Sequence, residues 1–214
     1  MDGILEELIV PYLKIENENK IPHLAYLSEK RVIPRILTFR QGKVYTEHIN
    51  GYRLNKILEH NSEIMSLLKY DEFEPKDVKN LLNIYEKIGS VCCFFNKIGV
   101  QHNDFEASNI ILNQDLTEIR VIDWEYSKYA PVSFRDAYTL MKNTHIVLKD
   151  YYGDTTLIEN IQSFLFESFF KGWIIEHDKI LTEGEKILLS SALELSKKYK
   201  NDENELKYFD FKFI

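Results

Sequence analysis

Hydrophobic residues near the start of the chain recur at the spacing of one helical turn. Over residues 18–30 an apolar face is formed by Ile21, Leu24 and Leu27, with Ala25 beside them. Side chains three and four residues apart share one face of a helix, so this segment predicts an amphipathic helix. Upstream, residues 4–14 suit a short helix or strand that Pro11 would end.

Two runs typical of strands follow, from Ile33 to Phe39 and from Lys43 to Ile49. The residues between them, Arg40-Gln41-Gly42, fit a tight turn, so the two runs predict a β-hairpin. Asn50-Gly51 is a strong stop signal after the second strand. The front of the chain is therefore expected to be a helix, a hairpin and a break.

Beyond the break the pattern is mainly helical. Residues 53–69 predict one helix, and residues 76–98 predict a longer one that Gly99 ends in the usual position after a helix. The apolar face of the longer helix comprises Val78, Leu81, Leu82, Tyr85, Ile88, Val91, Cys92 and Phe95. Two short strands, 110–112 and 119–122, interrupt the helices, and three or four more helices follow between about 134 and 199. The fold class is α+β.

Composition narrows the function classes. The net charge is −7 and the chain has no long basic run, which disfavours nucleic-acid binding. The adjacent Cys92 and Cys93 lie in an apolar run, where they are expected to be small buried hydrophobes in a reducing compartment. The first residues lack a basic region followed by a long apolar stretch, so we expect a cytoplasmic protein without a membrane span.

Residues 101–126, QHNDFEASNIILNQDLTEIRVIDWEY, carry the most informative pattern. His102 and Asp104 are followed by Asn109 five residues after the Asp, then by the strand pair, and then by Asp123. Phosphoryl transfer needs a carboxylate at the acceptor hydroxyl and oxygen ligands for Mg²⁺. Asp104 suits the first role, Asn109 and Asp123 suit the second, and a His102 ring nitrogen could hold the loop by bonding to its backbone.

This spacing resembles that of the aminoglycoside phosphotransferase and choline/ethanolamine kinase superfamily. His102-Asn103-Asp104 stands where protein kinases have H-R-D, and the string Ile122 to Tyr126, IDWEY, stands where they have D-F-G. The resemblance implies a protein-kinase-like fold of two lobes, with a reduced N-terminal lobe and hinge at 1–50 and a helical catalytic lobe at 51–214.

The same resemblance implies ATP and Mg²⁺ as cofactors and assigns roles to individual residues. Asp104 and His102 would be catalytic, and Asn109, Asp123 and Glu125 would lie at the metal. The backbone of Glu47, His48 and Ile49 would meet adenine, and Lys14, or alternatively Lys20, would contact the phosphates. Asp136 would anchor the catalytic loop rather than take part in chemistry.

The front of the chain departs from the family pattern. Its first forty residues contain only Gly3, so no glycine-rich loop over the phosphates is recognisable. A partner or the C-terminal segment could complete the site. Residues 206–214, LKYFDFKFI, are apolar enough either to pack on the body or to bind a protein partner or a second copy.

Three functions remain open on the sequence. The first is a phosphotransferase acting on the hydroxyl of a small molecule such as choline, ethanolamine, an aminoglycoside or a sugar. The second is a compact protein kinase working in a complex, and the third is a non-catalytic kinase-like module. Aromatic residues in the C-terminal half, such as Trp124 and Tyr126, are candidates for binding a quaternary ammonium, whereas Phe166, Phe169, Phe170 and Trp173 recur at helical spacing and are expected in the core.

Overall fold

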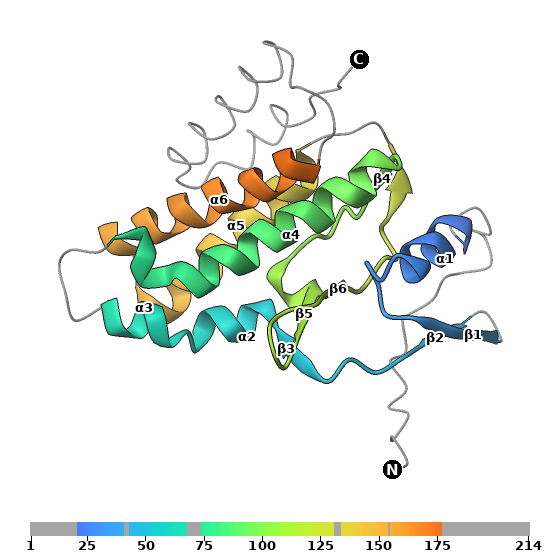
Figure 1. Cartoon of the computed structure of the whole chain (residues 1–214), viewed down its shortest axis with the longest axis horizontal. Coiled ribbons are helices and arrows are strands. Elements are labelled where there is room, and N and C mark those ends of the chain that lie inside the picture. The colour runs from blue at the N-terminus through green and yellow to red at the C-terminus, as the bar shows by residue number, and fades with distance from the viewer. Residues whose placement is uncertain (1–20, 41–42, 68–73, 131–133, 154, 177–214) are drawn as a thin grey trace, which may run out of the picture.

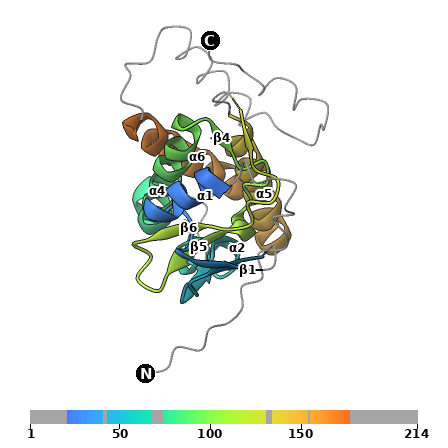
Figure 2. The ribbon, with the colours of Figure 1, turned by 90° about the vertical axis from the view of Figure 1, so that its right-hand side faces the viewer.

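A computed structural model of the chain describes residues 21–40, 43–67, 74–130, 134–153 and 155–176 (Figure 1). A body of long helices packs beside small sheets, and α1 with the β1–β2 hairpin lies at one end of it. Figure 2 looks onto that end and shows α1 in front of the helical body. The predicted α+β, protein-kinase-like fold with a small β lobe is confirmed. The division of the chain at residue 50 stays a prediction.

The front consists of α1 (Ile21–Glu29) and an antiparallel hairpin of β1 (Ile36–Arg40) and β2 (Lys43–Thr46). Leu24 and Leu27 are buried as predicted, but Ala25 is exposed, so that part of the predicted face is wrong. The first strand begins at Ile36 because Val32 and Ile33 are buried in the connection before it. There the Val121 amide donates to the Val32 carbonyl at 2.8 Å, which joins the front to the body.

A three-stranded antiparallel sheet lies beneath the hinge, with the order β3-β5-β6. Its strands are β3 (Gly51–Arg53), β5 (Ile110–Asn113) and β6 (Ile119–Val121). Gly51 is thus the first residue of a strand and not only the end of one. A Cβ at this position would overlap with the carbonyl oxygen of Leu112, so glycine lets β3 approach β5 closely.

The predicted single helix at 53–69 is two helices, α2 (Leu54–Glu59) and α3 (Ser62–Leu67). A distant side chain accounts for the break. The hydroxyl of Tyr152 lies 2.7 Å from the Leu58 carbonyl and accepts a hydrogen bond from the Asn61 amide at 3.1 Å. The Asn61 side chain then accepts from the Ile64 amide at 3.0 Å and so starts α3.

The helical body is built on α4 (Lys79–Lys97), α5 (Arg135–Tyr152) and α6 (Thr156–Glu176), with a short 3₁₀ segment, η2 (Pro75–Val78), before α4. Gly99 follows α4 with φ +75°, as predicted. Helices α4 and α6 cross at two glycines. A Cβ on Gly89 would overlap with the Phe169 carbonyl, and one on Gly172 would overlap with the Glu86 carbonyl, so the two backbones are in direct contact.

The core joins this helical body to the sheet. Cys92 and Cys93 are buried free thiols, and the predicted core aromatics Phe166, Phe169, Phe170 and Trp173 are each at most 2% exposed. Within the described residues, no helix is long and apolar enough to cross a membrane. Predictions for residues 4–14, the turn at 41–42, Lys14, Lys20, the helices beyond 176 and the 206–214 segment lie outside the described residues.

Candidate active site

The chemistry-bearing segment runs from β4 (Val100–Gln101) through the 3₁₀ turn η3 (Ala107–Asn109) into β5. Strand β4 pairs with β7 (Lys128–Tyr129), which fixes both ends of the 101–126 segment beside each other. The Ile122 amide donates to the Asn109 carbonyl at 2.9 Å. This bond brings Asn109 next to Asp123, as the strand pair between them led us to expect.

His102 holds the loop from inside the core. Its side chain is fully buried, and its Nδ1 accepts a hydrogen bond from the Asp104 amide at 3.2 Å. Nε2 therefore carries the proton and donates to the Ile122 carbonyl at 2.8 Å. Burial lowers the pKa of His102 to about 4, so the ring is neutral at physiological pH. His102 is a positioning residue, because its ring contacts the backbone and Trp124 rather than an open site.

Asp136, the first acidic residue of α5, anchors the same loop, as the resemblance implied. Its two carboxylate oxygens accept from the amides of His102 at 3.0 Å and Asn103 at 2.8 Å. Burial raises the pKa of Asp136 to about 6, against the lowering effect of these two bonds. A carboxylate held inside the protein thus orients the residues immediately before Asp104.

The backbone conformation and side-chain bond of Asn103 account for an asparagine between His102 and Asp104. Its φ is +64°, in the left-handed region that Asn tolerates better than most residues. Its side-chain amide donates to the Tyr126 carbonyl at 3.0 Å. This bond links the loop to the segment after Asp123, and nothing in the linear sequence signals it.

Asp104 and Asn109 are in direct contact. The Asn109 amide nitrogen donates to the Asp104 carbonyl oxygen at 2.9 Å and to its Oδ2 at 3.0 Å. With its nitrogen bound there, Asn109 offers its amide oxygen to a ligand, and Asp104 keeps Oδ1 for another partner. Asp104 is half-buried, so that oxygen is within reach of a substrate.

Asp123 has the properties expected of a cation ligand. Its φ is +63°, and its Oδ1 is buried without a hydrogen-bond partner among the described residues. Burial raises its pKa, and the charges of Glu125 and Asp104 raise it further, whereas Arg53 lowers it. A buried carboxylate oxygen without a donor and with acidic neighbours fits a cation such as Mg²⁺, which usually takes one or two protein carboxylates with phosphates and water.

The metal role predicted for Glu125 has less support from the geometry. Within the described part of the chain, no three His, Cys, Asp or Glu side chains gather closely enough to hold a metal. Glu125 interacts with Asp123 through its charge, and its hydrogen bond with the exposed Tyr126 raises the pKa of that tyrosine. Glu125 therefore lies near Asp123, and its role at a metal stays a prediction.

Glu106 is a candidate that the sequence analysis missed. Burial raises the pKa of its carboxyl, and the nearby charge of Asp104 raises it further. It accepts a long hydrogen bond of 3.4 Å from Asn143 of α5, whose side-chain oxygen also receives the Ala107 amide at 2.9 Å. The linear signal was available, because Glu106 lies two residues after Asp104, but an isolated Glu in a loop looks like any surface residue.

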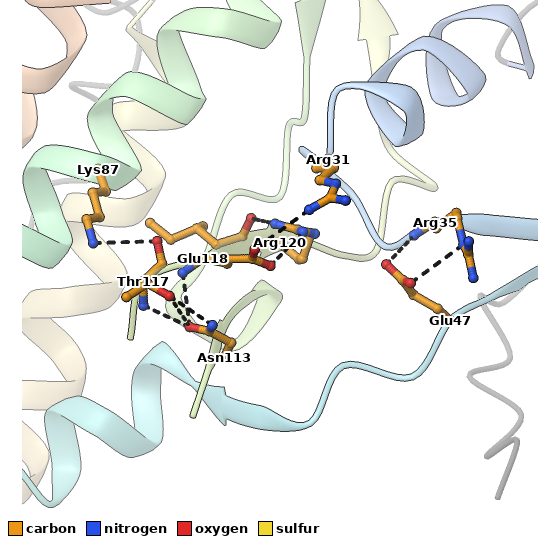
Figure 3. Close-up of polar contacts among 9 residues, drawn as sticks. Arg31, Arg35, Glu47, Lys87, Asn113, Thr117, Glu118 and Arg120 are labelled. Carbon is orange, nitrogen blue, oxygen red and sulfur yellow. Dashed lines mark hydrogen bonds and ion pairs between the residues drawn. The ribbon is translucent and has the colours of Figure 1, made fainter. Parts of the chain in front are cut away.

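The hinge, residues 47–50, connects β2 to β3. The Glu47 amide donates to the Arg35 carbonyl at 2.9 Å, and its carboxylate accepts from the Arg35 amide at 3.0 Å, as Figure 3 shows beside the ion pair of the two side chains. Ile49 makes no backbone hydrogen bond to any described residue, so its amide and carbonyl remain available. The adenine contact assigned to Glu47, His48 and Ile49 stays a prediction.

The aromatic candidates separate by burial. Trp124 is buried, donates its indole N–H to the Val121 carbonyl at 2.9 Å and packs against Phe95, so it belongs to the core and not to a ligand site. Tyr126 and Tyr129, by contrast, are more than half exposed on the segment after Asp123. Among the aromatic residues between 100 and 130 only these two are exposed, and Tyr126 is hydrogen-bonded to Glu125 of the acidic cluster.

Comparisons with known proteins agree with this geometry. The choline/ethanolamine kinase family model matches residues 54–147, somewhat less than half of the chain. A probable choline kinase 1 from Arabidopsis thaliana is 25% identical over 103 residues, which cover 48% of this chain and 28% of that protein. A probable casein kinase II subunit alpha homolog from Encephalitozoon cuniculi is 28% identical over 118 residues, covering 47% of this chain and 37% of that protein.

The chain therefore spans about a third of the length of these curated relatives. The matched residues begin at α2 and include the whole segment from His102 to Asp123 together with Asp136. Over residues 54–147 the chain is thus similar to the choline/ethanolamine kinases, and its α+β fold is kinase-like.

Proposed function

We propose that this chain is the catalytic part of a phosphotransferase that moves the γ-phosphoryl group of ATP to the hydroxyl of a small molecule. One observation carries the proposal. Asp104, Asn109 and Asp123 are drawn together by the Asn109–Asp104 bond and by the backbone bond from Ile122 to Asn109. These are a carboxylate for the acceptor and two oxygen ligands for a cation, in one place.

In this proposal Asp104 orients the acceptor. Its Oδ2 is fixed by Asn109, so Oδ1 receives the acceptor O–H and takes its proton as the oxygen attacks the γ-phosphorus. The new bond joins the acceptor oxygen to phosphorus, the bond from phosphorus to the β–γ bridging oxygen breaks, and ADP leaves. His102 and Asp136 keep the Asp104 backbone in place from behind.

Asn109 and Asp123 would hold Mg²⁺, with Glu125 near Asp123. The cation supplies positive charge that offsets the charge of the nucleotide phosphates. The unpartnered Oδ1 of Asp123 supports this assignment, because a buried carboxylate oxygen without a donor is otherwise costly. At the hinge, the unpaired backbone of Ile49, with Glu47 and His48 beside it, would receive the adenine edge, and Lys14 remains our prediction for the phosphates.

The acceptor is proposed to be an alcohol that also carries positive charge, such as an amino alcohol or an aminoglycoside. Glu106, Asp104 and Glu125 place several carboxylates around the position of the acceptor hydroxyl. The exposed ring of Tyr126 offers an aromatic face beside them. An uncharged sugar would use fewer of these groups.

A protein acceptor is the second candidate. The similarity to a protein described as a probable casein kinase II subunit alpha homolog favours it. In that case a partner, held for example by the 206–214 segment, would bring the hydroxyl to Asp104.

The test is ADP formation by the full chain with ATP and Mg²⁺ in the presence of choline, ethanolamine, aminoglycosides, sugars or a mixture of protein substrates, with mass spectrometry of the products. We expect a phosphorylated amino alcohol or aminoglycoside, with turnover reduced at least 100-fold in Asp104→Asn. The exposed Asp150 on α5 provides a matched control, Asp150→Asn, which should keep full activity. A phosphorylated protein would select the second candidate, and no acceptor-dependent product in any assay would contradict both.

A further inference from the structure

A polar pocket of about 490 Å³, here called the rear pocket, is lined by the hinge residues Glu47, His48 and Ile49 but by none of the residues assigned to phosphoryl transfer. Three separate segments form its walls: the end of α1 and the connection to β1 with Arg31 and Arg35, the hinge from Glu47 to Asn50, and the β5–β6 hairpin with Arg120. Neither Asp104, Asn109 nor Asp123 lines it. Its volume is within the usual range for small-molecule sites. Figure 3 shows how the charged side chains from these segments are arranged.

The deepest charge in this rear pocket is positive. Arg120 is only 7% exposed, and its Nε is buried without a hydrogen-bond partner among the described residues. Its other nitrogens donate to the Ile119 carbonyl and to Glu118, each at 2.9 Å. A charged donor without an acceptor is costly to bury. A ligand that brings an acceptor to this guanidinium would therefore stabilise it.

The carboxylates at the rim of the rear pocket do not occupy all the donors of its arginines. Glu118 is shared between Arg120 and Arg31, and its distance to Arg31 is 3.8 Å, too long for a hydrogen bond. Arg35 lies 3.7 Å from the Glu47 carboxylate, which instead accepts from the Arg35 backbone amide. Arg31 and Arg35 are both more than 70% exposed, so most of their donors remain open to a ligand.

Formally the three arginines are matched by Glu29, Glu47 and Glu118. The arginines and the carboxylates differ, however, in how far solvent screens their charges. Glu118 is 50% exposed, Glu47 is 33% exposed and Glu29 is on the surface, so solvent screens all three carboxylates more than it screens Arg120, whose side chain is 8% exposed. An anion at the floor of the rear pocket therefore experiences a net attraction.

The backbone of Arg31 adds an independent indication. Its φ is +58°, a left-handed conformation at the end of α1 where glycine is the usual residue. An arginine at this position strains the backbone, and its guanidinium makes only the long ion pair to Glu118. The fold itself would be served better by glycine, so the side chain at this position is unexplained by folding.

We infer that the rear pocket binds a small metabolite through an oxyanion, a phosphate or a carboxylate, held by Arg120 at the floor and by Arg31 and Arg35 at the rim. Guanidinium groups match both oxyanions with paired hydrogen bonds. Because the pocket walls come from the front, the hinge and the body, the ligand would join these parts of the molecule.

The test is calorimetric titration of the full chain with pyrophosphate and, separately, with citrate, both in EDTA so that no nucleotide–metal complex forms. We expect saturable binding of at least one probe at about millimolar concentration or below, and the probe that binds tells phosphate from carboxylate recognition. Arg120→Met and Arg31→Gly should each weaken this binding about tenfold. Arg31→Gly should keep or raise the melting temperature, since glycine suits φ +58°.

Two controls separate this site from the proposed active site. Lys79→Ala removes one exposed positive charge elsewhere on the surface and should leave probe binding unchanged. Asp123→Asn should also leave it unchanged, so loss of ATP binding in that variant would say nothing against the rear pocket. Absence of saturable binding up to about 10 mM, or equal affinity in wild type, Arg31→Gly and Arg120→Met, would overturn the inference.

Discussion

The loop at 102–109 and the front of the molecule both attach near the end of strand β6, at Ile122 and Val121, but through different interactions. The loop at 102–109 is held by buried groups: His102 bonds to the Ile122 carbonyl, and Asp136 receives two loop amides. The front is joined by the backbone bond from Val121 to Val32, by buried apolar side chains such as Leu27, and by exposed ion pairs such as Arg31 with Glu118. The residues assigned to chemistry are thus held by buried polar groups, whereas the front is held by apolar packing and its side-chain ion pairs lie where water and salt weaken them.

This difference predicts that mutations behind the loop are costly and mutations of the exposed ion pairs at the front are mild. The largest effect is expected for Asp136→Ala. It leaves the amides of His102 and Asn103 buried without an acceptor, which should lower the free energy of unfolding by about 3 kcal/mol or more. Urea denaturation measures this, with Asp150→Asn on the same helix as the control. A loss under about 1 kcal/mol would mean that the loop is held by other contacts.

The next effect is the pH dependence of stability, to which His102 and Asp136 contribute with opposite sign. The folded pKa of His102, about 4, lies below its ordinary 6.5, so its contribution to stability is present above pH 6.5 and is lost as pH falls toward 4. The folded pKa of Asp136, about 6, lies above its ordinary 3.8, so its contribution is present below pH 3.8 and is lost as pH rises through 6. The two changes largely cancel between pH 4 and 6.

Removing either titrating group should therefore reveal the pH dependence that the other gives to stability. From pH 6.5 to 4, Asp136→Asn should lose on the order of 2–3 kcal/mol more stability than wild type, and His102→Gln should lose less than wild type by a similar amount. Chemical denaturation at several pH values tests this. Parallel stability profiles for wild type and both variants would show that neither group titrates as the structure indicates.

A smaller effect is expected at the break between α2 and α3. Tyr152→Phe removes the hydroxyl that meets the Leu58 carbonyl and the Asn61 amide, and it should cost about 1–2 kcal/mol. Tyr52→Phe, on an exposed tyrosine, serves as the control. If both variants had the same stability as wild type, Tyr152 would not be what divides this segment into two helices.

The smallest effect is expected at the front attachment. Arg31→Gln removes the long ion pair with Glu118 and leaves the pair of Glu118 with the buried Arg120 in place, so it should change stability by under about 1 kcal/mol. The difference from wild type should shrink in high salt, as thermal melts at 50 mM and about 1 M salt would reveal. A large, salt-independent loss would mean that the front is fixed as firmly as the catalytic loop.

The sequence predicted elements well where local periodicity and tertiary packing agree. The helix ending at Gly99 and the strand pair around residue 115 are where the pattern placed them. The helix at 53–69 was predicted as one because its break depends on Tyr152, more than eighty residues away in sequence. A periodicity argument contains no information on such a partner.

The candidate site was predicted on a similar basis. The spacing from His102 to Asp123 identified the residues that the structure brings together, and the resemblance identified Asp136 as an anchor. Glu106 was missed because only its distance from Asp104 in three dimensions distinguishes it. The rear pocket was missed because its arginines come from segments about 90 residues apart.

The central claim is that Asp104, Asn109 and Asp123 form a site for a nucleotide with a cation. Calorimetric titration of the full chain with ATP, with and without Mg²⁺, tests it most directly in wild type, Asp123→Asn and the control Asp150→Asn. We predict binding that requires Mg²⁺, that is lost in Asp123→Asn and kept in the control, and that weakens as pH falls, because the pKa of Asp123 is raised. Binding that is indifferent to Mg²⁺ and to Asp123→Asn, or no binding at millimolar ATP, would contradict the claim.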